Sequence, residues 1–228
     1  MYYLVLVLPM VILSVWASAK VNSSFKKYSK VTTRRNFTAT EAARQILDSH
    51  GLHDVKIEAI SGNLTDHYDP KSNVIRLSDS VRNSTSVAAV GVAAHEAGHA
   101  VQHAEGYSFI KIRNSLVPVA NLGSKLSIPL IILGLVLMGG ESLFGITMVY
   151  AGIILFSLAV LFQVVTLPVE FDASNKAIKV LDEGGYLYGD EVKDVKKVLG
   201  AAAMTYVAAA ATSIAQLLRL ILIARDRD

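Results

Sequence analysis

The sequence predicts an α+β membrane protein that is mainly helical, with about four transmembrane helices and a small cytoplasmic domain holding a short antiparallel sheet. Three observations predict this fold class. The chain of 228 residues is 52% hydrophobic with a mean hydropathy of +0.43, too apolar for an ordinary soluble domain of its size. Its apolar residues gather in long segments. Between the first two of these segments lie helical and alternating patterns that are typical of a folded domain.

Four apolar segments are long enough, or nearly so, to cross a bilayer. They are Tyr2–Ala19, Leu126–Gly140, Leu143–Val169 and Ala201–Ala224. A hydrocarbon core about 30 Å thick is crossed by roughly 20 helical residues. The second segment is short, so either it begins nearer Val117 or it is a tilted hairpin partner of the third, with the turn expected at 139–142.

The first and last segments each have an alternative interpretation. Ala17–Ala19 resembles a signal-peptide cleavage site. However, the positive charges follow the first apolar segment instead of preceding it, which favours a retained anchor. The last segment contains Arg219, which is costly in mid-membrane and would suit a helix packed on the soluble domain. We prefer a transmembrane helix whose Arg219 side chain reaches the interface.

The distribution of charge predicts orientation. Most of the 22 Lys and Arg residues lie in Lys20–Lys125 or Glu170–Gly200, whereas the loop around Glu141 has none. The positive-inside rule therefore predicts a multi-pass protein of the cell membrane with both long loops in the cytoplasm. The net charge of +3 is too small and dispersed to indicate a nucleic-acid partner. The expected organisation is an anchor (1–19), a cytoplasmic domain (20–125), a transmembrane hairpin (126–169), a cytoplasmic segment (170–200) and a transmembrane helix (201–224).

Local signals order the cytoplasmic domain. Thr38–Glu41 has the pattern of a capping box and opens a helix expected to end near Ser49, with Gly51 just beyond it. Ser84 or Ser86 is a candidate N-cap for a later helix that reaches Gln102.

Two strands are expected between these helices. Val55–Ile60 alternates, and Asn73–Leu77 follows a turn at Asp69–Ser72, so we predict a short antiparallel sheet. The edge of such a sheet can bind an extended peptide as an added strand.

His95–His99 reads HEAGH and is the main chemical signal. On a helix, residues four apart share a face, so His95 and His99 can bind one Zn²⁺ while Glu96 accepts a proton. Bound zinc lowers the pKa of a water molecule to roughly 7. The motif therefore predicts metal-assisted hydrolysis of a peptide bond, the alternative being a helix with ordinary hydrogen bonds. Gly98 costs about 1 kcal/mol relative to Ala in a helix, which suggests close packing there.

A catalytic zinc site needs a third protein ligand. The chain has no Cys, so the ligand must be a His or a carboxylate. His103 is about 12 Å from His95 along a straight helix, too far for both to bind one metal ion. Glu105 is excluded by a similar distance unless the helix ends early. Glu170, directly after the third apolar segment, is the preferred ligand.

The segment around Glu170 supplies further candidates. We expect a new helix to begin after Pro168, with Glu170 in its first turn. The alternative is that Glu170 binds no metal and is only an N-terminal carboxylate stabilised by the helix dipole. Asp172 is a candidate to orient a His N–H, or else a solvated acid. The candidates for an oxyanion donor are His67, Tyr68, Arg76 and Tyr206, with interfacial packing as the alternative for each Tyr.

Several stretches resemble the YugP-type membrane neutral zinc metallopeptidases of prokaryotes. They are Ala93–Gln102, Pro168–Ser174, Asp66–Pro70, Ile75–Ser78 and Ala201–Ala208. The resemblance spans nearly the whole chain. It implies a membrane-bound, gluzincin-like peptidase with a zincin-like domain, in which His95 and His99 bind zinc and Glu96 is the base.

The order of the site residues also resembles that of the HtpX-type and CAAX prenyl endopeptidases. Their third-ligand helix often carries an Asp four residues after the Glu, where this chain has Ser174.

We therefore expect a membrane-anchored zinc endopeptidase with one Zn²⁺ per chain and a peptide or protein substrate. One alternative is a site-2-type intramembrane protease, whose third ligand is an Asp in an LDG-like motif. Leu181–Gly184 matches that motif weakly and would make Asp182 the ligand. Another is a membrane quality-control or scaffold protein whose zinc site is structural or vestigial.

Overall fold

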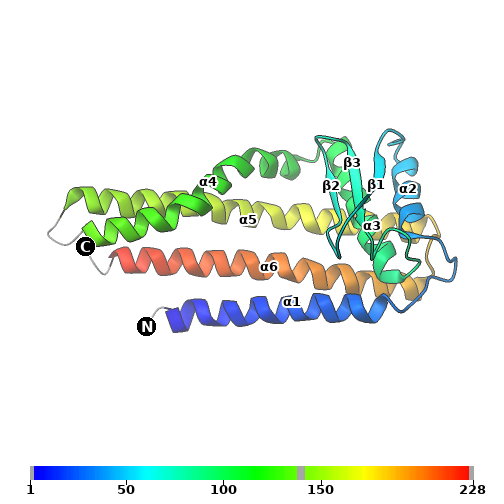
Figure 1. Ribbon diagram of the computed structural model, residues 1–228, viewed down its shortest axis with the longest axis horizontal. Helices are drawn as coiled ribbons and strands as arrows, with labels where there is room; N and C mark the ends of the chain where they lie inside the picture. The colour runs from blue at the N-terminus through cyan, green and yellow to red at the C-terminus, as the bar shows by residue number, and fades with distance from the viewer. Residues whose placement is uncertain (1–2, 138–141, 226–228) are drawn as a thin grey trace. The chain divides into compact units, whose positions relative to one another are not determined.

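The computed structural model describes residues 3–137 and 142–225, and these are mostly helical (Figure 1). The elements in chain order are a π-helix η1 (Tyr3–Val7), α1 (Leu8–Tyr28), α2 (Ala39–Ser49), β1 (Lys56–Ile60), β2 (His67–Asp69), β3 (Val74–Ser78), α3 (Val87–Ala104), α4 (Ser108–Leu137), α5 (Leu143–Glu183) and α6 (Gly189–Arg225).

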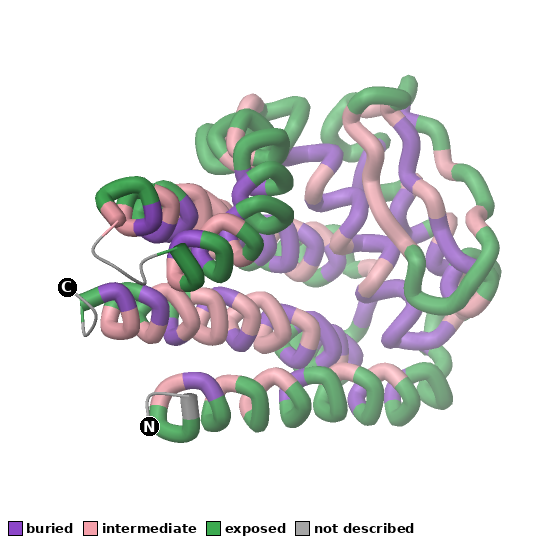
Figure 2. The backbone as a smooth tube through the Cα atoms, turned by 60° about the vertical axis from the view of Figure 1, so that its left-hand side comes forward, coloured by how far each residue is buried: buried purple, intermediate pink, exposed green. Residues whose placement is uncertain are grey.

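Four helices of the described chain are long and apolar enough to cross a membrane, as the sequence predicts. They are Leu4–Tyr28, α4, α5 and α6. In the most apolar window of each, at most 28% of the residues are buried within the protein. Figure 2 shows how much of α1 is exposed. Unburied apolar side chains of this kind suit contact with lipid. The turn expected at 139–142 lies, except for Ser142, outside the described residues.

The chain divides into two compact units. Unit 1 comprises Met1–Trp16, Lys111–Pro168 and Tyr206–Asp228, and unit 2 comprises Ala17–Ile110 and Val169–Thr205. Within unit 1, Ile131, Val149 and Leu220 belong to one buried apolar cluster.

Unit 2 contains the sheet and the larger apolar core. Side chains from α2, β3, α3, α5 and α6 meet in this core, among them Ile46, Leu77, Val90, Leu181 and Val195. The capping box of α2 is confirmed, because Glu41 N donates to Thr38 Oγ1 (3.2 Å) and Thr38 N donates to Glu41 Oε2 (2.6 Å). Gly51 has a φ of +71°, the left-handed conformation expected of a glycine just beyond the end of a helix.

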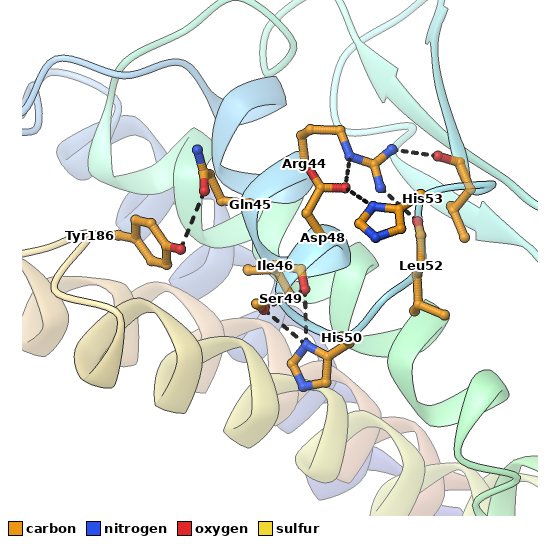
Figure 3. A network of polar contacts seen from close by, with 10 residues as sticks. Arg44, Gln45, Ile46, Asp48, Ser49, His50, Leu52, His53 and Tyr186 are labelled. Atoms are coloured by element: carbon orange, nitrogen blue, oxygen red, sulfur yellow. Dashed lines mark hydrogen bonds and ion pairs between the residues drawn. The ribbon is translucent and has the colours of Figure 1, made fainter.

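Arg44 connects α2 to the segment that enters β1 (Figure 3). Its guanidinium donates to the carbonyls of Val55 (2.7 Å) and Leu52 (2.6 Å) and pairs with Asp48 at 2.8 Å. The network thus satisfies carbonyl groups that neither helix nor strand would pair.

The predicted antiparallel sheet is wrong in one respect, because the sheet is mixed. Its strand order is β1-β3-β2, with β1 parallel and β2 antiparallel to β3. The predicted turn at Asp69–Ser72 joins β3 to β2, a strand of three residues that the sequence pattern did not indicate. β1 therefore pairs with the opposite edge of β3.

The turn between β2 and β3 is held by one carboxylate. Asp69 accepts hydrogen bonds from the Ser72 hydroxyl (2.6 Å) and the Lys71 N–H (3.0 Å). These bonds stabilise the charged form and lower the pKa of Asp69 to about 2.

The prediction that a new helix begins after Pro168 is also wrong, because α5 runs unbroken from Leu143 to Glu183. A proline inside a helix removes one hydrogen bond and costs about 3 kcal/mol. The turns that follow Pro168 continue as helix because Val169, Ala173 and Ala177 are completely buried. Glu170 therefore lies in the middle of a long helix and not in a first turn.

Candidate metal centre

Helix α3 presents the two motif histidines on one face. The helix begins as the sequence predicts, with Ser86 as its N-cap accepting from Ala89 N (3.3 Å). Its flanks are small and apolar, so the helix is almost entirely buried in unit 2. The rings of His95 and His99 lie 4.6 Å apart between centroids.

Glu170, from α5, completes the cluster. Its Oε2 atom lies 3.3 Å from His95 Nε2 and 3.6 Å from His99 Nε2. The ligand atoms of the three residues all lie within 4.8 Å of one another. Within residues 3–137 and 142–225, no other set of three His, Asp or Glu side chains meets in this way.

The donor set fits a zinc ion. Zinc takes His nitrogen and carboxylate oxygen at about 2.0–2.2 Å, and a tetrahedron with such bonds separates its corners by about 3.3–3.6 Å. The two Nε2–Oε2 distances are close to that value. The site is also shielded, since only 14%, 12% and 6% of the His95, His99 and Glu170 side chains are exposed.

The electrostatics of the cluster favour a cation. Burial alone would lower the pKa of His99, but the hydrogen bond that His99 donates to Glu170 and the charges of Glu96 and Glu170 outweigh burial and raise the pKa. The same negative charges that favour an imidazolium favour a divalent metal ion. A metal must displace that proton, so its affinity falls as the pH falls.

Gly98 lets α3 and α5 approach closely enough to form the cluster. A Cβ atom at this position would overlap the carbonyl oxygen of Ala173, a backbone atom that a side-chain movement cannot displace. Ala173 lies between Glu170 and Ser174, both of which contact the motif histidines. The close packing that the sequence suggested for Gly98 is thus confirmed.

We expect Gly98→Ala to weaken zinc binding and to lower the melting temperature, despite the higher helix propensity of Ala. The added methyl group must move α3 away from α5, and overpacking of this kind costs about 1–3 kcal/mol. Thermal unfolding and zinc titration measure the two effects. Gly200→Ala is the matched control, because a Cβ at Gly200 meets nothing within 4 Å. An unchanged zinc affinity in Gly98→Ala would contradict the packing argument.

Gln102 orients His99. The Nε2 atom of Gln102 donates to Val169 O (2.8 Å) and to Asp172 Oδ2 (2.7 Å), which uses both of its donors. Its Oε1 atom, 3.0 Å from His99 Nδ1, must therefore accept, so His99 carries its proton on Nδ1. The Nε2 lone pair of His99 is then available to a metal.

Ser174 has the corresponding place beside His95. Its hydroxyl lies 3.1 Å from His95 Nδ1. Ser174 thus stands where the similar endopeptidases often have an Asp, and it keeps a hydrogen-bonding group on that ring. Asp172 does not contact a histidine directly, as the sequence suggested it might, but acts on His99 through Gln102.

Sequence reasoning missed Gln102. Its place three residues after His99, on the same helical face, is a signal that could have identified it. The side chain is completely buried, a costly position for an amide unless its polar atoms are paired.

We expect Gln102→Leu to lower the zinc affinity by about 10–100-fold, the usual effect of removing a group that orients a metal-bound histidine. The substitution keeps the volume of the side chain but removes both the acceptor for His99 and the donors to α5. Competition with a chelating dye measures the affinity. His103→Leu is the control, since His103 is a neighbouring exposed residue on α3. Equal affinities in the two variants would refute the role of Gln102.

Glu96 lies beside the cluster and is held by the sheet. Its side chain is 9% exposed, and its Oε2 atom accepts a hydrogen bond from the Tyr68 N–H in β2 (3.0 Å). The backbone of Tyr68, a residue that the sequence suggested as an oxyanion donor, therefore contacts the HEAGH motif. The Tyr68 hydroxyl donates to Asn73 Oδ1 (3.0 Å).

The other predicted residues lie in varied surroundings. His67 Nδ1 lies 2.9 Å from Thr65 O, and Arg76 pairs with Asp69 (3.4 Å) and Glu58 (3.7 Å). Tyr206 belongs to unit 1. The roles of His67, Tyr68, Arg76 and Tyr206 as oxyanion donors stay predictions.

The residues excluded on distance have other contacts. His103 is exposed, and its ring lies 6.1 Å from that of Tyr68. Glu105 pairs with Lys176 at 2.6 Å. Asp182, the candidate of the intramembrane alternative, is exposed on α5 and does not belong to the cluster. Nor is α3 one of the four candidate spans found in the described chain.

Comparison with known proteins agrees with this geometry. The model of a family described as "Putative neutral zinc metallopeptidase" matches residues 3–225. The chain belongs to this family. A curated member from Bacillus subtilis (strain 168), "Putative membrane protease YugP", is 49% identical over 211 residues, which cover 92% of this chain and 91% of the relative. No solved structure gives a significant match. The resemblance seen in the sequence is thus confirmed for this zinc metallopeptidase family.

Proposed function

We propose that this family member is a membrane-anchored, zinc-dependent endopeptidase. The observation that carries the proposal is the meeting of His95, His99 and Glu170 beside the Glu96 carboxylate. A zinc ion held there supplies Lewis acidity toward water and toward the peptide carbonyl. Because these three side chains would be the only protein ligands, a bound zinc would stay accessible to water and substrate, as in catalytic and unlike structural zinc sites.

Glu96 performs the proton transfers in this proposal. It accepts a proton from the attacking water and delivers it to the leaving amine. The Tyr68 N–H holds one oxygen of the carboxylate, which leaves the other oxygen for the reacting proton. Gln102 and Ser174 keep the two imidazoles in orientation.

We further propose that the protein crosses the membrane several times and that the metal centre faces the cytoplasm. The support for this orientation is the excess of Lys and Arg in the segments that flank the apolar helices. The chain has no Cys, so single cysteines report on sidedness. An impermeant maleimide should label Ser142→Cys but not Lys71→Cys in intact cells, and the reverse result would overturn the orientation.

Removal and return of the metal test the activity. We expect the purified full-length protein to cleave casein, to lose this activity with 1,10-phenanthroline, and to recover it with one equivalent of zinc. A zinc-loaded protein that cleaves neither casein nor itself would refute the proposal and favour the scaffold alternative.

A further inference from the structure

A cavity of about 660 Å³ opens between α5 and α6 in unit 2. It is lined by Phe171, Ser174, Asn175, Ile178, Lys179, Asp182 and Glu183 of α5 and by Lys196, Leu199, Gly200, Ala203 and Met204 of α6. This volume is within the range of about 300–1,000 Å³ that is typical of ligand-binding pockets.

The cavity adjoins the metal centre through one residue. Ser174 lines the cavity, and the same side chain lies 3.1 Å from His95 Nδ1. A molecule bound in the cavity therefore lies one side chain away from a residue that would hold zinc.

The lining changes from apolar to charged along its length. Phe171 and Ile178 come first on α5, and Lys179, Asp182 and Glu183 follow. Phe171 and Asp182 are about 16 Å apart along the helix axis, at 1.5 Å per residue. An extended peptide covers that distance with about five residues.

The charged end is available to a ligand. It contains two cations, Lys179 and Lys196, and two anions, Asp182 and Glu183, and all four side chains are exposed. Among the described residues, none of the four makes an ion pair or a side-chain hydrogen bond that would occupy it. This mixture of charges is complementary to a peptide that itself carries both signs. A purely anionic lipid headgroup would be complementary to the two cations alone.

Gly200 keeps the cavity open. Glycine costs about 1 kcal/mol relative to Ala in a helix, and Gly98 offsets that cost by close packing. Gly200 has no such contact, since a Cβ there would meet nothing within 4 Å. A larger side chain introduced at Gly200, which lines the cavity, would therefore extend into free space there.

We propose that this cavity is a substrate subsite that binds an extended peptide segment in which an apolar run gives way to charged residues. The apolar part lies against Phe171, Ile178 and Met204, and the charged part reaches Lys179, Asp182 and Lys196. Such segments occur where transmembrane helices leave the bilayer, so the preferred substrates are membrane proteins cut near the membrane surface. The inference rests on the proposed peptidase function.

Gly200→Leu tests the subsite by filling the cavity from an open position. The protein is the full chain in nanodiscs with Glu96→Gln as background, and the probe is a fluorescein-labelled peptide of Leu and Val followed by alternating Lys and Asp. We expect Gly200→Leu to weaken binding at least tenfold by fluorescence anisotropy. The matched control is Gly189→Leu, which should change binding less than twofold, because Gly189 begins the same helix outside the cavity and a Cβ there also meets nothing within 4 Å. Zinc content and melting temperature, measured in parallel, verify that both variants are folded and loaded.

The outcomes separate this proposal from the proposed function. With Glu96 restored, cleavage of the peptide with an unchanged KM in Gly200→Leu would overturn the subsite but leave the peptidase. Binding that depends on Gly200, without cleavage by the zinc-loaded protein, would support the subsite but refute the peptidase. A fluorescent fatty acid that is displaced by Gly200→Leu, while the peptide is not, would assign the cavity to lipid and overturn the proposal.

Discussion

Glu96→Gln is expected to reduce kcat/KM on casein by about 100- to 10,000-fold while zinc stays bound. A positioned general base contributes this much, and an amide cannot accept the proton. The Gln side chain retains an acceptor for the Tyr68 N–H, so the fold around β2 should be preserved. Fluorescent casein hydrolysis and metal analysis of the same sample measure the two quantities.

The control for this variant is Glu105→Gln, which removes a carboxylate at the end of α3. Glu105 is exposed and pairs with Lys176, away from the cluster. Its loss should change activity less than twofold. Equal activity in wild type and Glu96→Gln would refute the assignment of Glu96 as the base.

Glu170→Ala is expected to abolish stable zinc binding. The substitution removes one of the three proposed ligands and the carboxylate of the cluster, leaving the two histidines. The loss of affinity should exceed the roughly 10–100-fold that removal of an orienting neighbour causes. Zinc content after dialysis against a weak chelator gives the result, and activity should disappear with the metal.

Asp182→Ala is the matched control, because Asp182 lies on the same helix and is exposed. It should retain a full equivalent of zinc. Zinc retained in Glu170→Ala but lost in Asp182→Ala would overturn our ligand set and support the intramembrane alternative.

The parts of this site that the sequence predicted are those governed by local spacing. His95 and His99 share a helical face whatever surrounds them, and Ser86 caps its own helix. The distance argument against His103 needed only the rise of a helix. The prediction of Glu170 went further than local spacing. It relied on the need of a catalytic zinc site for a third ligand, and so brought together two segments that are far apart in the chain.

The parts that the sequence did not predict depend on partners distant in the chain. β2 has three residues, too few for a recognisable alternation, and exists because β3 pairs with it. Pro168 usually ends a helix, but burial of the turns that follow outweighs that preference. Gln102 is a ligand-orienting residue only because Asp172 and Val169 occupy its amide nitrogen.

The contact between Gly98 and Ala173 also bears on what the motif means. In the pattern HExxH the two middle positions are written as free, and a search for it accepts any residue there. In this chain the second of them faces a carbonyl group of α5 that admits only hydrogen, so its identity is as strongly constrained as that of a metal ligand. For this architecture the more informative motif is HExGH. A chain with a bulkier residue in place of the glycine should need a wider separation of the helices that correspond to α3 and α5.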